Sequence, residues 1–368
     1  MWRAAVDRDK PMGPASEKRA SSHSTDARCY PMLVHHTKEG KEVDSAKAVY
    51  NHKMNAKELF MNGEFIPAER GVFSVRTHAF AYGTSCFEGI RGYWNAQEQQ
   101  VYLFRAREHY ERLLRSCQVL QMQLPYTADQ MVELSVELIR RNDQHQDVYI
   151  RPVAYKNQEI LGVQLHGLTN DLIITSEPQG NYVELTGMRC GVSSWRRVDD
   201  NAIPARAKIS GAYVNSAFAK SEALQNGYDE AIMLTNEGHV SEGSAENIFL
   251  VTNGELITPS PSENILLGIT RETVIELARR ELGVITRERQ IDRTELYSAD
   301  EIILCGTGAQ IAPVIEVDHR SIGSGKTGPI SSALQKIYFD VVRGNLPEYR
   351  KQWCTPAFVK QQSANPAD

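Results

Sequence analysis

The spacing of hydrophobic residues divides the chain from residue 57 onward into segments with the period of helices and segments with the period of strands. Apolar residues recur three or four positions apart, which predicts a buried helical face, in residues 105–122, 128–142, 215–226, 270–282 and 328–343. Short apolar or alternating runs predict strands at residues 147–156, 171–177, 189–197, 230–236, 247–252, 255–258, 285–291 and 301–305. Asn62-Gly63, between two short apolar runs, predicts the turn of a β-hairpin.

The mixture of these elements predicts the fold class. Strands outnumber helices and do not alternate strictly with them, which favours an α+β fold over a doubly wound parallel sheet. A chain of 368 residues is also long for one core, because domains usually contain roughly 100–200 residues. We expect a small α/β domain over residues 57–177, a linker over 178–187 and a larger domain over 188–355. Residues 1–56 are expected to form a flexible extension, and residues 356–368 a tail.

Composition and charge narrow the classes of partner. The hydrophobic fraction of 41% and formal charge of −5 are typical of a soluble globular protein without a basic excess for nucleic acid. No apolar run approaches the roughly 20 residues that cross a bilayer, and the first 56 residues lack a secretory apolar stretch and contain too many acids for a typical transit peptide. The six cysteines form no C-x-x-C pair, which indicates reduced thiols. We therefore expect a cytoplasmic protein that acts on small molecules or other proteins.

One lysine stands out by its neighbours. Lys208 lies among small and apolar residues, between Pro204 and Gly211. Desolvation favours the neutral amine that forms a Schiff base, so a lysine in such surroundings is a candidate nucleophile. A surface lysine in a loop is the alternative interpretation, and the local sequence alone favours it.

Two carboxylates follow in a turn of small residues, directly before an apolar strand. Either Glu242 or Glu246 is placed to bind the protonated ring nitrogen of a cofactor that acts as an electron sink. An ordinary acidic turn explains the same residues.

Two further turns are candidate anion sites. Gly268-Ile269-Thr270 opens the predicted helix over 270–282, whose first N–H groups have no partner within the helix. Gly306-Thr307-Gly308-Ala309 follows a predicted strand and also offers backbone N–H groups. Taken singly, each turn is equally well a plain cap or loop.

The N-terminal half contains a segment dense in glycine and aromatic residues, residues 82–93, and two arginines in partly apolar surroundings, Arg112 and Arg151. Glycines permit close approach of the backbone, and the arginines are able to bind anions. Solvated surface arginines are the commoner case.

Together, these segments resemble the class IV aminotransferases, the pyridoxal-phosphate enzymes of fold type IV, and most closely the branched-chain amino acid aminotransferases. The resemblance extends from about residue 57 to 350. The motifs that carry it are Tyr-Gly-Thr-Ser-x-Phe-Glu-Gly-Ile-Arg (82–91), Tyr-Ile-Arg-Pro (149–152), Ser-Glu-Gly-x-x-Glu-Asn (241–247) and Gly-Ile-Thr-Arg (268–271). It implies two domains, the larger with a barrel-like sheet, and pyridoxal 5'-phosphate as the cofactor.

The resemblance also implies a role for individual residues. Lys208 carries the cofactor and moves a proton as general base, then acid; Glu242 holds the pyridine nitrogen, and Tyr213 supports the phenolic oxygen. The other implied cofactor residues are Arg112, Gly268, Ile269, Thr270, Gly306 and Thr307. The implied substrate residues are Tyr82, Phe87, Gly89, Arg91, Tyr149, Arg151, Tyr182, Thr307, Gly308 and Ala309.

Among these residues, Arg151 matches the one that meets a distal carboxylate. The sequence departs from the family pattern at Gln179, where an aromatic residue often stands, and at Gln310 and Ala312, which replace Glu and Thr. These departures bear on substrate range rather than on the cofactor.

The implied activity is transfer of the amino group of leucine, isoleucine or valine to 2-oxoglutarate, giving glutamate and a branched 2-oxo acid by a ping-pong mechanism. The implied context is branched-chain amino acid biosynthesis by a homodimer or larger homo-oligomer. Three alternatives use the same scaffold: a D-amino acid or (R)-amine aminotransferase, an aminodeoxychorismate lyase, and a non-catalytic pyridoxal-phosphate binder.

Two further patterns are not expected to bind ligands. Residues 323–328 resemble a P-loop, but Arg320 stands where that motif needs a glycine, and no buried strand precedes it. The ten histidines show no metal-ligand spacing, so no metal is expected.

Overall fold

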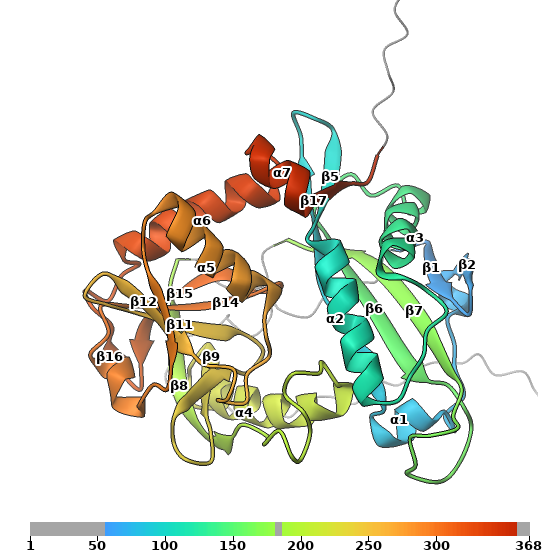
Figure 1. The fold of residues 1–368 in the computed structure, drawn as a ribbon, viewed down its shortest axis with the longest axis horizontal. Coiled ribbons are helices and arrows are strands. Elements are labelled where there is room, and N and C mark those ends of the chain that lie inside the picture. The colour runs from blue at the N-terminus through green and yellow to red at the C-terminus, as the bar shows by residue number, and fades with distance from the viewer. Residues whose placement is uncertain (1–55, 181–185, 359–368) are drawn as a thin grey trace, which may run out of the picture. The chain divides into compact units, whose positions relative to one another are not determined.

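Two β-sheets organise residues 56–180 and 186–358, which are the residues that the computed structural model describes (Figure 1). Helices and strands are mixed along the chain, so the predicted α+β class is confirmed. The predicted N-terminal extension lies, apart from Ala56, outside the described residues, as do residues 359–368 of the tail.

The first sheet has eight strands in the order β17-β5-β4-β6-β7-β1-β2, with β3 paired to β6. All its pairs are antiparallel. The edge strand β17 comes from the C-terminal end of the described chain and pairs with β5. The strands are β1 Glu58–Met61, β2 Glu64–Pro67, β3 Ser85–Phe87, β4 Ile90–Asn95, β5 Gln100–Phe104, β6 Val148–Lys156, β7 Asn170–Pro178 and β17 Cys354–Pro356.

Helices α2 (Ala106–Val119) and α3 (Ala128–Arg141) pack on this sheet, and the short α1 (His78–Tyr82) precedes β3. Buried and partly exposed residues alternate along most of β6 and β7, so one sheet face meets the helices. A capping box of Thr127 and Gln130 fixes the start of α3, where the sequence predicts it.

The second sheet has nine strands in the order β10-β9-β8-β15-β14-β11-β12-β13, with β16 paired to β15. It is mixed, because β8·β9, β8·β15 and β12·β13 are parallel pairs. Its strands are β8 Met188–Arg196, β9 Glu230–Leu234, β10 Val240–Gly243, β11 Asn247–Thr252, β12 Glu255–Pro259, β13 Thr286–Arg289, β14 Glu301–Gly306, β15 Gln310–Val317 and β16 Arg320–Ser321. Its helices are α4 Tyr213–Gln225, α5 Ile269–Glu281, α6 Pro329–Val342 and α7 Pro347–Trp353.

The central strands of the second sheet are buried on both faces. In β11, Phe249 and Val251 pack in a cluster with side chains of α5 and α6, whereas Ile248 and Leu250 pack in a different cluster. That second cluster contains side chains from β8, β9, β12, β14 and β15. Strands separated in the sheet order thus share one core, which requires the sheet to curl into the expected barrel-like form.

The structure adds elements to those predicted. Strands β3, β4 and β5 and helix α1 are not among the predicted elements, and glycines interrupt the period of two around β3 and β4. Gly92 lies within β4, where an added Cβ would meet the Val101 and Val148 side chains at 2.7 and 2.8 Å. Close packing therefore selects glycine inside a strand.

The predicted division into two domains stays a prediction. The linker proposed for residues 178–187 includes residues 181–185, which are not described, and β17 places residues 354–356 on the N-terminal sheet. Within the described ranges, no helix has the length and apolar character needed to span a bilayer.

The P-loop-like segment precedes α6, and a carboxylate already fills the start of that helix. Glu301 accepts hydrogen bonds from the Ile330 and Ser331 N–H groups at 3.0 and 2.8 Å. An added Cβ on Gly328 would lie 2.1 Å from the Glu301 carboxyl carbon. The start of α6 is thus occupied by a protein carboxylate.

Candidate active site

Lys208 lies in the segment that precedes α4, and its backbone is held by the N-terminal part of the chain. Its N–H donates to the Ser116 hydroxyl of α2 at 3.0 Å, and its carbonyl accepts the Phe87 N–H at 3.1 Å. The flanking Ala207 and Ile209 are buried, and the Lys208 side chain is half-buried. The apolar neighbours thus anchor the backbone rather than enclose the lysine completely.

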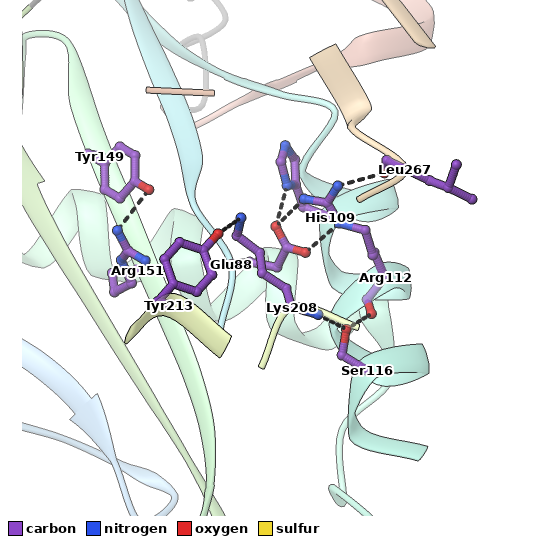
Figure 2. Close-up of polar contacts among 9 residues, drawn as sticks. All are labelled: Glu88, His109, Arg112, Ser116, Tyr149, Arg151, Lys208, Tyr213 and Leu267. Atoms are coloured by element: carbon purple, nitrogen blue, oxygen red, sulfur yellow. Dashed lines mark hydrogen bonds and ion pairs between the residues drawn. The ribbon is translucent and has the colours of Figure 1, made fainter. Parts of the chain in front are cut away.

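The Lys208 amine faces two aromatic rings. Its Nζ donates to the Tyr213 hydroxyl at 2.6 Å (Figure 2). It also lies 5.1 and 5.2 Å from the ring centroids of Phe87 and Tyr213. Those two rings pack edge to face at 4.7 Å. The ion pairs found among the described residues do not include Lys208. The amine therefore contacts a phenol and apolar surface instead of a neutralising carboxylate.

A wall that is both aromatic and cationic stands beside Phe87. The Arg151 guanidinium donates to the Tyr149 hydroxyl at 3.0 Å (Figure 2). It also lies 4.5 Å from the Phe87 ring centroid. Gly89 is required next to Tyr149, because a Cβ there would lie 1.9 Å from the Tyr149 hydroxyl oxygen. The structure thus brings four predicted substrate residues together near Lys208.

Arg91 connects the two ends of the predicted pocket. It is buried, and its guanidinium donates to the carbonyl oxygens of Gln179, at 2.7 Å, Gly180 and Gly308. It therefore links the start of the predicted linker to the turn at residues 306–309. The side-chain role expected of Gln179 is not visible in these bonds, which use its backbone.

Two predicted substrate residues are not joined to this group. Tyr82 is 38% exposed, and its hydroxyl accepts the Gly162 N–H at 3.3 Å. Tyr182 lies outside the described residues.

Arg112 meets the start of α5 through a buried network. Its Nε and Nη2 donate to Glu88 at 2.7 and 2.8 Å, and its Nη1 donates to the Leu267 carbonyl at 2.8 Å (Figure 2). Leu267 directly precedes Gly268, the residue that caps α5. His109 adds a third bond to Glu88 at 2.7 Å.

These bonds leave N–H groups of Arg112 and of the start of α5 available to bind an anion. A guanidinium has five N–H groups, so three bonds leave Arg112 one N–H on each terminal nitrogen to bind phosphate or carboxylate. The first N–H groups of α5, around Ile269 and Thr270, have no partner within the helix. Gly268 is needed here, because a Cβ would lie 2.0 Å from the Asn247 side-chain oxygen.

The two candidate acids have different surroundings. Glu242 pairs with Arg197 at 2.8 Å and accepts bonds from the Asn247 amide at 3.0 Å and the Leu266 N–H at 3.1 Å. Burial raises the pKa of Glu242, and the nearby cations Arg197, Lys208 and Arg112 oppose this shift. Glu242 is therefore the acid that an adjacent arginine and two hydrogen-bond donors stabilise against the effect of burial.

Glu246 is buried beside a second acid, Glu230, and both burial and Glu230 raise the pKa of Glu246. The cation in this cluster, Lys220, pairs with Glu230 at 2.6 Å.

The turn at 306–309 lies against this region, since a Cβ on Gly306 would lie 3.5 Å from the Ala245 carbonyl. Thr307, Gly308 and Ala309 therefore begin close to the turn that follows β10, the strand that contains Glu242.

Sequence reasoning missed several residues of this network. Glu88 stands inside a quoted motif without an assigned role, and Arg197 is the second of two adjacent arginines at the end of the strand predicted over 189–197. Nothing in the sequence signals that His109 and Ser116 face the same group of residues from α2. No cluster of metal-ligating side chains occurs among residues 56–180 and 186–358.

Comparison with known proteins gives the family. Residues 85–317, more than half of the chain, match the family described as amino-transferase class IV. The chain belongs to the class IV aminotransferases. This aminotransferase is 51% identical over 302 residues to the probable branched-chain-amino-acid aminotransferase of Aquifex aeolicus (strain VF5), covering 82% of this chain and 97% of the relative. The resemblance inferred from the motifs is thereby confirmed.

Solved structures show the same fold. The branched-chain aminotransferase of Thermoproteus uzoniensis with norvaline has a TM-score of 0.79 and 42% identity, covering 82% of this chain and 99% of that one. The branched-chain amino acid aminotransferase of Thermobaculum terrenum in its PLP-bound holo form has a TM-score of 0.79 and 40% identity, covering 83% of this chain and 100% of that one. This class IV aminotransferase is therefore a transaminase of fold type IV, as predicted.

Proposed function

We propose that this aminotransferase uses pyridoxal 5'-phosphate to move the amino group of leucine, isoleucine or valine to 2-oxoglutarate. The observation that carries the proposal is the position of Lys208, whose amine contacts Tyr213 beside the wall of Phe87, Tyr149 and Arg151. The printed names of its relatives, at up to 51% identity, support the same substrates.

The donor set fits the cofactor. Arg112 with the α5 start and Thr307 would hold its phosphate, Glu242 its pyridine nitrogen, Tyr213 its phenolic oxygen, and Lys208 would attach it covalently. When bound, the cofactor supplies an electron sink that stabilises negative charge at the substrate Cα. The phosphate, the pyridine nitrogen, the phenolic oxygen and the covalent attachment point of the cofactor thus each have a suitable residue among those that the structure describes.

Glu242 would hold a positively charged ring nitrogen of the cofactor in place. Three donors, from Arg197, Asn247 and Leu266, hold the carboxylate in one orientation and support its charge against burial. An oriented buried carboxylate accepts a strong charge-assisted hydrogen bond. The protein therefore favours a protonated nitrogen at this point.

Lys208 moves the proton. Its amine would accept the proton from the substrate Cα and later donate it, acting first as general base and then as acid. The Tyr213 hydroxyl at 2.6 Å holds the amine, and the Phe87 and Tyr213 rings limit access of water to it.

The wall beside Lys208 suits two kinds of substrate. The Phe87 and Tyr149 rings present apolar surface to an aliphatic side chain, while Arg151, held by Tyr149, presents a cation to the distal carboxylate of glutamate or 2-oxoglutarate. A ping-pong transaminase needs both properties in one site, because the two substrates enter in turn.

We also infer that the enzyme acts in the cytoplasm as a homodimer or larger homo-oligomer. Seven large apolar or aromatic side chains around α1 and the loop after β6 are exposed by 38–92%. They are Val72, Phe73, Val75, Phe80, Tyr82, Leu161 and Val163. Exposed apolar side chains of this kind are typical of a protein interface. They include the predicted substrate residue Tyr82, so we infer that a second copy of the chain covers Tyr82. Analytical ultracentrifugation tests the inferred homo-oligomer, and a monomer would contradict it.

The reaction is tested by an amino-donor panel. L-leucine, L-isoleucine and L-valine should each give glutamate from 2-oxoglutarate. Activity with D-alanine alone, or pyruvate release from aminodeoxychorismate, would overturn the proposal in favour of another reaction on the same scaffold.

Lys208→Ala tests the assigned residue. The variant should lose turnover and also the cofactor adduct that borohydride reduction traps for mass spectrometry. The matched control is Lys336→Ala, an exposed lysine on α6, which should retain both. Turnover by the Lys208 variant would refute the assignment.

A further inference from the structure

Glu88 is buried at the centre of the network that holds Arg112. Its side chain is 0% exposed and accepts three hydrogen bonds, two from Arg112 and one from His109. Burial by itself raises the pKa of Glu88, but the Arg112 and His109 partners outweigh it and hold that pKa well below its usual range. Glu88 is therefore a carboxylate across the working pH range.

His109 completes the network without adding charge. Burial lowers the pKa of His109 and the nearby Arg112 opposes its protonation further, although Glu88 favours it. A neutral His109 must carry its hydrogen on Nδ1, because its partner there is a carboxylate. One negative and one positive charge thus compensate each other before any ligand binds.

Local structure brings the three groups together. His109 and Arg112 are three positions apart on α2, so they project from one buried helical face. Glu88 stands between β3 and β4, where its N–H donates to the Pro152 carbonyl at 3.0 Å. Ser116, one turn beyond Arg112, accepts the Lys208 N–H. The same helix face therefore also positions the Lys208 segment.

We propose that Glu88, oriented by His109, is a positioning residue that fixes the Arg112 guanidinium so that its two free N–H groups bind the cofactor phosphate. Glu88 itself does not touch the phosphate. Glu88 accepts from Nε and Nη2, the Leu267 carbonyl accepts from Nη1, and one hydrogen remains on each terminal nitrogen. This inference rests on the proposed cofactor and goes beyond it by assigning the residues that build its phosphate subsite.

The structure also indicates why fixation matters. An arginine side chain has high rotamer entropy, and a bidentate partner removes it before binding. With Glu88 neutral, Arg112 would keep its charge but lose its fixed edge. The phosphate would then bind a mobile cation beside the α5 N-terminus.

The test compares pyridoxal 5'-phosphate with pyridoxal, which lacks the phosphate. Glu88→Gln should weaken binding of the phosphorylated ligand to apoprotein about 10- to 100-fold, the range for a lost hydrogen bond to a charged group, and change pyridoxal affinity less than about twofold. In an Arg112→Gln background, Glu88→Gln should add little, because both act on one contact. Glu111→Gln, at a 42%-exposed side chain of the same helix, is the matched control.

The outcomes separate the possible failures. Equal weakening of both ligands, or full additivity with Arg112→Gln, would show a merely structural role and overturn the inference. If Glu88→Gln does not fold, His109→Leu removes one of the three bonds and keeps the ion pair; it should weaken the phosphorylated ligand selectively, and an unselective effect overturns the inference. If the unmodified apoprotein binds neither ligand, the proposed function fails instead.

Discussion

Replacing Arg197 with glutamine should leave Glu242 as a buried carboxylate without its cationic partner. The two side chains are only 9% and 7% exposed and lie 2.8 Å apart, so solvent screens the pair little. Breaking a buried pair by removing one partner costs about 3–5 kcal/mol, and a retained amide hydrogen bond would offset about 1 kcal/mol of it. We therefore expect a loss of about 2–4 kcal/mol in the free energy of unfolding when Glu242 is ionised.

The loss should depend on pH in a defined direction. Burial already raises the pKa of Glu242, and Arg197 is the largest influence that opposes this shift. Without Arg197, the folded-state pKa rises further above the unfolded value of about 4.3. A group with a raised folded pKa contributes stability at low pH and loses it as the pH rises through that pKa. The deficit of the variant should thus be small near pH 5 and large near pH 8.

Urea unfolding of the apoprotein at both pH values measures this effect. The control is Arg196→Gln, the same substitution at an exposed neighbour, which should change the free energy of unfolding by less than about 0.5 kcal/mol. An Arg197→Gln deficit that is equal at both pH values, or matched by the control, would refute the claim that Arg197 supports the Glu242 charge.

Two glycines give further predictions. Gly268→Ala should displace the Asn247 side chain, whose oxygen lies 2.0 Å from the new Cβ. Titration of the apoprotein should then show pyridoxal phosphate binding weakened by about tenfold or more. An unchanged affinity would contradict the packing argument. Gly89→Ala should displace Tyr149, whose hydroxyl lies 1.9 Å from the new Cβ, and thereby release the arginine that it holds. The KM for 2-oxoglutarate should then rise more than the KM for leucine, and an equal rise would point to general disruption.

Much of the fold follows from local patterns that survive in the structure. The helix predicted over 270–282 is α5, Ile269–Glu281, and the strand predicted over 247–252 is β11 with the same bounds. These elements have a continuous apolar period, so neighbours along the chain decide them. In contrast, the local pattern does not predict β15 (Gln310–Val317), although most of it is buried in the second sheet. It pairs with β14, the strand just before it in the chain, and with β8, which lies far earlier in the chain, and the pairing with β8 is invisible to a local pattern.

The sequence by itself determined the family, because the spacing of its motifs identifies a class IV aminotransferase without any coordinates. It left open whether Lys208 was a surface residue and which of Glu242 and Glu246 carries a supported charge. Only the tertiary structure decided these points. Arg197 lies in a different element from Glu242, and Tyr213 and Phe87 reach Lys208 from opposite directions along the chain. The charge and orientation of a buried group depend on partners that folding brings together, and one sequence does not specify their distances.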